Sequence, residues 1–319
     1  MNYNLKKYFN IINFFFLFLI CILAVINFFL DLPSTYIYIF CFLLIATVGV
    51  SHGAYDGKAG EKLFFNKYKK WKFIFYFVYI ALAILVFLIW YLNPLISLII
   101  FLTVSALHFG KEDLEIYLDK KYKINLFIFF LKGSLIILLP LFFNFEQTNL
   151  IFNTILFSKD YVLLSNNYIK FILILNLLMQ SLFYLYFYLK KKLNRNDFSS
   201  IIFEIFLIII IFYLFTPIVA FTLYFCFMHS LKNILLISNE LNPNLFRGFQ
   251  IFIKQSLFLT LITFFILFIS LFFLIKFDFL ENSIEKIIFI GLASLTLPHI
   301  ILHYIAENIK ISKILRVRL

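Results

Sequence analysis

The chain has 319 residues, of which 64% are hydrophobic and 14% charged, with only 8 Gly and 6 Pro. Soluble domains are about half apolar and a quarter charged, so a soluble fold of this length could not bury so much apolar surface. The composition excludes a soluble enzyme, a disordered protein and a disulfide-rich secreted scaffold. It predicts an all-α, polytopic membrane helix bundle embedded in the lipid bilayer.

Ten segments have the roughly 20 apolar residues that a membrane-spanning helix needs. They are 11–30, 34–51, 72–92, 95–111, 126–145, 168–189, 200–215, 217–236, 252–275 and 286–306. The first is expected to be a retained helix, because no small-residue cleavage site follows it. Only Thr216-Pro217 separates the seventh from the eighth, so one kinked helix over 200–236 is the alternative. Segment 146–167 is at best amphipathic, which would place it along the membrane surface. The sequence shows no convincing internal repeat and no linker that would divide it, so residues 1–319 are expected to form one membrane domain.

Basic residues indicate the orientation of these segments. The net charge is +12, but the basic residues form short clusters between apolar runs, so no nucleic-acid partner is expected. With both termini cytoplasmic, 23 of the 28 Lys and Arg residues fall on the cytoplasmic side and four on the outer side. Lys132 lies inside the fifth segment, where its amine is expected to snorkel. We therefore predict a multi-pass protein of the cell inner membrane with cytoplasmic termini.

The five histidines share one level of the predicted bundle. All lie in even-numbered segments, near the cytoplasmic face and within roughly 10–15 Å of one another in depth. They are His52, His108, His229, His299 and His303. Polar groups inside a bilayer are costly unless they pair or bind something, and neutral imidazole is a common ligand of iron, copper and zinc. The pattern predicts a metal site, although a lone histidine at a helix end is more often an interfacial residue.

Acidic residues lie close to the first two histidines. Asp56 follows the first by four residues, and Glu112 and Asp113 follow the second. Carboxylates often bind the second ring nitrogen of a metal-bound imidazole, which would fix its tautomer. Alternatively, these acids balance neighbouring lysines on hydrated loops. Another acid, Glu204, is explained by an interfacial position near the start of the seventh segment.

Four short motifs surround the histidines in a fixed order. They are Gly49-Val50-Ser51-His52-Gly53-Ala54-Tyr55-Asp56, Ser105-Ala106-Leu107-His108-Phe109-Gly110 with Asp113 nearby, Phe225-Cys226-Phe227-Met228-His229-Ser230, and Leu297-Pro298-His299. The first is similar to the Gly-x-x-His-Gly-x-x-Asp pattern of the Brp/Blh family of bacterial and archaeal β-carotene dioxygenases. The whole set resembles that family in order and covers the second to tenth segments.

This resemblance implies an activity and a cofactor. Family members cleave β-carotene at its central double bond with dioxygen, giving two molecules of retinal for a microbial rhodopsin, and Fe(2+) held by histidines is the implied cofactor. When the resemblance is carried over position by position, the first candidates for iron ligands are His52, His108 and His229, and the next is His299. His303 is a further candidate.

One position departs from the family pattern. A second histidine is expected four residues after His229, and this chain has Asn233 there. An asparagine oxygen is a poorer iron ligand than imidazole, so either His299 or His303 supplies the missing nitrogen, or the site is altered. Asp56, Asp113 and Asn233 are expected to support the ligands from outside.

Two other functions stay open on the sequence alone. Histidine pairs on facing helices could bind haem in an electron-transfer protein, or the histidines and Glu204 could form the relay of a non-enzymatic transporter. A membrane di-iron desaturase is disfavoured, because its histidine boxes need about eight histidines and the chain has 5.

Overall fold

The computed structural model describes residues 3–64, 69–118, 126–158, 162 and 165–316. Regular structure in this part of the chain is entirely helical, which confirms the predicted fold class. The α-helices are α1 (Tyr3–Phe29), α2 (Ser34–Leu44), α3 (Asp56–Phe64), α4 (Trp71–Leu92), α5 (Pro94–Glu115), α6 (Leu126–Phe143), α7 (Phe145–Leu156), α8 (Asn166–Leu189), α9 (Arg195–Leu214), α10 (Pro217–Leu223), α11 (Leu231–Leu241), α12 (Leu245–Leu274) and α13 (Leu280–Arg316).

Within the described residues, ten helical runs are long and apolar enough to cross a membrane. The spans predicted from hydropathy are confirmed, and so is the break between the seventh and the eighth. Helix α9 ends at Leu214, and α10 begins at Pro217 with Thr216 as its N-cap residue. Proline at the first helical position has no N–H that the helix would need, so it starts a new helix without loss of a hydrogen bond.

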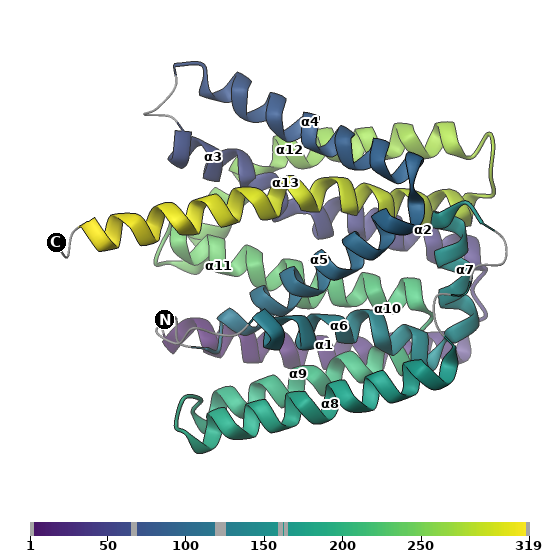
Figure 1. Ribbon diagram of the computed structural model, residues 1–319, viewed down its shortest axis with the longest axis horizontal. Helices are drawn as coiled ribbons and strands as arrows, with labels where there is room; N and C mark the ends of the chain where they lie inside the picture. The colour runs from purple at the N-terminus through teal and green to yellow at the C-terminus, as the bar shows by residue number, and fades with distance from the viewer. Residues whose placement is uncertain (1–2, 65–68, 119–125, 159–161, 163–164, 317–319) are drawn as a thin grey trace.

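Both chain ends lie at one end of the bundle, and α7 lies at the other (Figure 1). Helix α7 runs across the long helices, as expected for the amphipathic segment 146–167; residues 159–161 and 163–164 of that segment lie outside the described residues. Termini at one end agree with an even number of spans, while their cytoplasmic location stays a prediction. Several of the counted basic residues also lie outside the described part: Lys67, Lys120, Lys121, Lys123, Lys159 and Arg318.

Helices α5 and α6 pack backbone to backbone, which fixes the helix that carries His108. A Cβ atom added to Gly110 would lie 1.8 Å from the carbonyl oxygen of Phe129, and one added to Gly133 would lie 1.8 Å from that of Ala106. Only glycine allows such an approach, which is typical of helix packing in membranes.

Two predictions about single residues are wrong. Helix α9 begins at Arg195, five residues earlier than expected, so Glu204 lies at mid-helix and is 1% exposed rather than interfacial. Its carboxylate accepts hydrogen bonds from Asn13, Tyr117 and Lys232. Lys132 does not snorkel, because neighbouring helices enclose its side chain, which is also 1% exposed.

Candidate metal centre

Two π-helical turns bring His52 and His229 together. One covers Ile45–Gly49, just before His52, and the other covers Tyr224–Ser230 and contains His229. The turns cross at Gly49, where an added Cβ would lie 2.6 Å from the ring of Phe225, and the Ser230 hydroxyl donates a 2.8 Å hydrogen bond to the Gly49 carbonyl. π-Helical turns occur frequently at functional sites because they redirect side chains within a helix.

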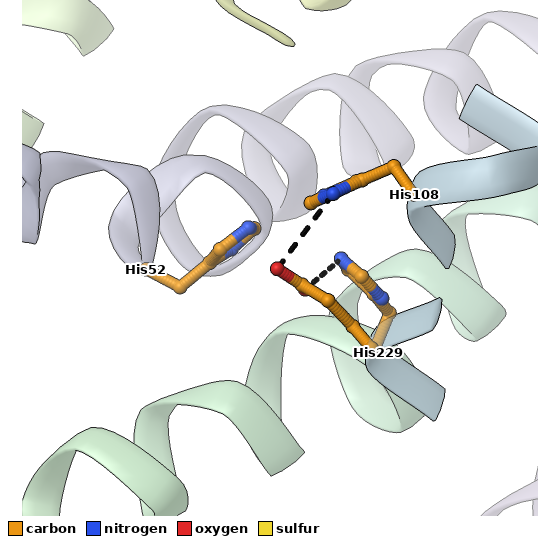
Figure 2. A group of neighbouring side chains, drawn as sticks. His52, His108 and His229 are labelled. Carbon is orange, nitrogen blue, oxygen red and sulfur yellow. Dashed lines mark ion pairs between the residues drawn. The ribbon is translucent and has the colours of Figure 1, made fainter. Parts of the chain in front are cut away.

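Four imidazoles from four spans form a closed ring of neighbours. The ring centroids are 5.3 Å apart for His52 and His229, 5.4 Å for His229 and His108, 5.3 Å for His108 and His299, and 5.5 Å for His299 and His52. Figure 2 shows three of these residues converging from separate helices. Four of the five histidines that were predicted to share one level are thus neighbours in the structure, and their binding of a metal stays a prediction.

The fifth histidine lies beside this ring of four rather than in it. His303 follows His299 by one helical turn, and the two ring centroids are 4.3 Å apart. Its side chain is nevertheless 48% exposed, and its Nε2 lies 3.7 Å from Oδ1 of Asp56. The sequence therefore placed His303 at the right level, but its side chain is turned toward the outside of the cluster.

Several ring nitrogens are free to bind an ion. Nδ1 of His52 lies 2.9 Å from the carbonyl oxygen of Gly49, and Nδ1 of His299 lies 2.8 Å from Oδ2 of Asp56. Because these oxygens only accept, each Nδ1 carries a proton, and in the neutral imidazole Nε2 then keeps its lone pair. Nε2 of His299 and both nitrogens of His229 are buried without a hydrogen bond. Buried polar atoms without partners are rare, and a metal ion would satisfy them.

The acidic residues face the imidazoles rather than the lysines of hydrated loops. Asp56 binds His299, which is 243 positions away in the chain, rather than its sequence neighbour His52. Asp113 accepts a 2.9 Å hydrogen bond from Tyr224, and its Oδ1 lies 3.7 Å from Nδ1 of His229. Both aspartates thus lie against a histidine other than their sequence neighbour: Asp56 binds Nδ1 of His299, and Asp113 lies near His229 without a hydrogen bond to it. Their support of metal ligands stays a prediction.

Glu112 lies near three of the four imidazoles, those of His108, His229 and His299, which is more than either aspartate does. The dashed lines in Figure 2 are its ion pairs with His108, at 3.7 Å, and with His229, at 3.3 Å. One ligand atom each of His52, His108, His229 and Glu112 lie within 4.8 Å of one another. In the sequence, Glu112 is only one of two acids that follow His108, and its place among three imidazoles depends on the tertiary structure.

Charged groups near the cluster leave an excess of negative charge when the imidazoles are neutral. Four carboxylates then face two lysine amines, which is a formal excess of two negative charges: Asp56, Glu112, Asp113 and Glu204 against Lys132 and Lys232. Uncompensated charge inside a bilayer protein is costly. A divalent cation among the imidazoles would cancel this excess, so the residues present fit such an ion.

Two apolar cavities lie next to the cluster. The larger, counted with space that is open to the surroundings, has about 650 Å³ not filled by protein atoms, and it is lined by residues of α5, α6, α7, α9, α10 and α13. One of its walls is the ring of Phe109, whose centroid is 4.7 Å from that of His229. The smaller, about 240 Å³, lies between α2, α12 and α13 and includes Val50 and Leu295, close in sequence to His52 and His299.

Comparisons with known proteins identify the family of this chain. The chain belongs to the family described as beta-carotene 15,15'-dioxygenase, whose model matches residues 43–306. A curated relative from uncultured marine bacterium 66A03, named beta-carotene 15,15'-dioxygenase, is 28% identical over 260 residues, which are 81% of this chain and 90% of the relative. The predicted family resemblance is confirmed. No solved structure matches the chain.

Proposed function

We propose that this member of the β-carotene 15,15'-dioxygenase family cleaves β-carotene, or a related carotenoid, at the central double bond. One C=C bond is replaced by two C=O bonds, and the two oxygen atoms come from dioxygen, so each half leaves as retinal. The observation that carries the proposal is the closed ring of four imidazoles, drawn from four helices, beside apolar cavities inside a membrane bundle.

The ring of imidazoles would hold iron(II). The proposed ligands are His52, His108, His229 and His299, and the exposure of His303 makes it a weaker candidate. Bound iron would supply the activation of dioxygen, as in other non-haem iron oxygenases. The protein's own part is to orient the ligands: the Gly49 carbonyl and the Asp56 carboxylate each hold one Nδ1–H and thereby direct the opposite Nε2 inward.

The cavities would select the bond that is cleaved. β-Carotene is a long apolar molecule that is dissolved in the bilayer, so it can enter between helices without crossing water. The larger cavity has the apolar lining of a small-molecule site. Because both cavities are lined in part by α13, the helix that carries His299, the two arms of the substrate would extend into them and present the middle of the polyene to the imidazoles.

The rival functions fit the geometry less well. Four neighbouring rings around one point leave no space for the plane of a haem, which needs two axial histidines and an empty plane between them. A transport relay needs ionisable groups spread across the membrane, whereas these histidines collect at one level. We expect purified protein to show no Soret band.

The test is expression in cells that make β-carotene. Loss of colour and appearance of retinal, measured by chromatography, are the expected results. Replacing His52, His108 or His229 with Ala should abolish retinal formation while the protein stays inserted. His303→Ala is the matched control on the same cluster. Retinal formation by any of the three alanine variants would remove that residue from the ligand set.

The setting of the reaction is part of the proposal. We place the protein in the inner membrane, and the excess of basic residues on the side of the termini favours an orientation with both ends in the cytoplasm. Retinal released into the same bilayer could pass directly to a membrane protein such as a microbial rhodopsin.

A further inference from the structure

A carboxylate lies among the four imidazoles. Oε1 of Glu112 is 3.7 Å from Nδ1 of His108 and 3.9 Å from Nε2 of His299, and Oε2 is 3.3 Å from Nε2 of His229. The side chain is only 16% exposed, and Nε2 of His229 and of His299 make no hydrogen bond. The carboxylate and the free imidazole nitrogens therefore face the same small space.

Asn233 holds this carboxylate in place. It lies one helical turn after His229, on α11, and its Nδ2 donates a 2.5 Å hydrogen bond to Oε2 of Glu112. This is the position at which the motif pattern leads us to expect an imidazole. An amide N–H is a donor and cannot bind a cation. In this chain, residue 233 thus orients an oxygen ligand instead of offering a nitrogen ligand.

We propose that Glu112 is an anionic ligand of the iron and that Asn233 is a positioning residue that orients it. This inference rests on the proposed function, because it concerns the same ion. Carboxylate oxygen combined with imidazole nitrogen is a ligand set that non-haem iron(II) sites use. The hydrogen bond from Asn233 occupies one lone pair of Oε2 and fixes the carboxylate so that Oε2 faces His229 and Oε1 faces His108 and His299.

The test compares iron binding by full-length variants in detergent. The variants are Glu112→Gln, Asn233→Ala and the double variant Glu112→Gln with Asn233→His, and the matched control is Glu115→Gln. Glu115 lies three residues further along α5 and pairs with Lys111 rather than with the cluster. Each protein is titrated with ferrous ions without oxygen, and iron X-ray absorption then reports the nitrogen and oxygen ligands.

The expected results differ between variants. Glu112→Gln keeps the shape of the side chain but loses its charge, so iron affinity should fall by about 10–100-fold or more, and one oxygen ligand should disappear. Asn233→Ala should also weaken iron binding by about 10–100-fold, but the X-ray absorption spectrum should still show all the nitrogen and oxygen ligands. The double variant should bind at least about tenfold more tightly than Glu112→Gln, since an imidazole replaces the lost ligand. Glu115→Gln should bind as the unaltered protein does.

Two outcomes overturn the inference in different ways. If the unaltered protein binds iron and forms retinal, and Glu112→Gln binds iron equally well with an unchanged absorption spectrum, Glu112 is not a ligand and only this inference fails. If the unaltered protein binds no iron, the proposed metal centre fails and this inference fails with it. Circular dichroism of every variant shows whether the fold is kept.

Discussion

Replacing Asp56 with Asn tests whether a carboxylate orients an iron ligand from outside. Asp56 binds Nδ1 of His299 through both oxygens, at 2.8 and 3.0 Å, and also accepts a 3.0 Å hydrogen bond from Tyr79. The side chain is 4% exposed. Asparagine keeps the shape but removes the negative charge that holds the Nδ1–H of His299, so the imidazole loses both its fixed orientation and part of its basicity.

The size of the effect follows from this contact. A hydrogen bond to a charged group contributes about 1.5–3 kcal/mol. At about 1.4 kcal/mol for each factor of ten, this loss corresponds to iron binding that is weaker by roughly 10–150-fold. Tyr79→Phe removes only one neutral donor from the same carboxylate, so its effect should be about tenfold or less.

The assay is anaerobic titration of purified protein with ferrous ions, followed by retinal formation at low and saturating iron. We expect Asp56→Asn to lose activity at low iron and to recover much of it when iron is added. Glu61→Gln is the matched control, because Glu61 lies on the same helix, pairs with Lys58 and is 35% exposed. An Asp56→Asn protein with unchanged iron affinity would refute the assignment of Asp56 as a support of His299.

The remaining predictions concern the edges of the site. Asn233→His should preserve or raise retinal formation, since an imidazole there can bind iron; a sharp loss would show that the amide is required. His303→Ala should leave the measured iron content unchanged, because its ring faces outward. Ser105→Phe fills part of the larger cavity, so KM for β-carotene should rise by about tenfold or more while the iron content stays normal. Ser105→Ala, the control, should leave KM unchanged. Loss of iron in the phenylalanine variant would contradict this prediction. Gly133→Leu should lower the free energy of unfolding in detergent by about 1–3 kcal/mol or more, because no side chain fits against the backbone of Ala106. The melting temperature should fall accordingly, and an unchanged melting temperature would argue against the close packing.

Hydropathy determined the membrane spans of this protein without tertiary information. A bilayer permits only long apolar helices or closed barrels, so composition and segment length are enough to predict the bundle and its span count. Helical rise also fixes how deep each residue lies along its own span. For that reason the common level of His52, His108, His229 and His299 could be predicted, and the motifs around them indicated the family.

Tertiary packing decided which side chains meet. His299 and His303 lie on one face of one helix, yet only His299 faces the other imidazoles. Likewise, Asp56 binds a histidine 243 positions away rather than the one four positions away. A sequence fixes the depth and face of a residue relative to its own helix axis, but the rotation of each helix depends on contacts such as that of Gly49 with Phe225. These contacts involve residues far apart in the chain, which local periodicity does not encode.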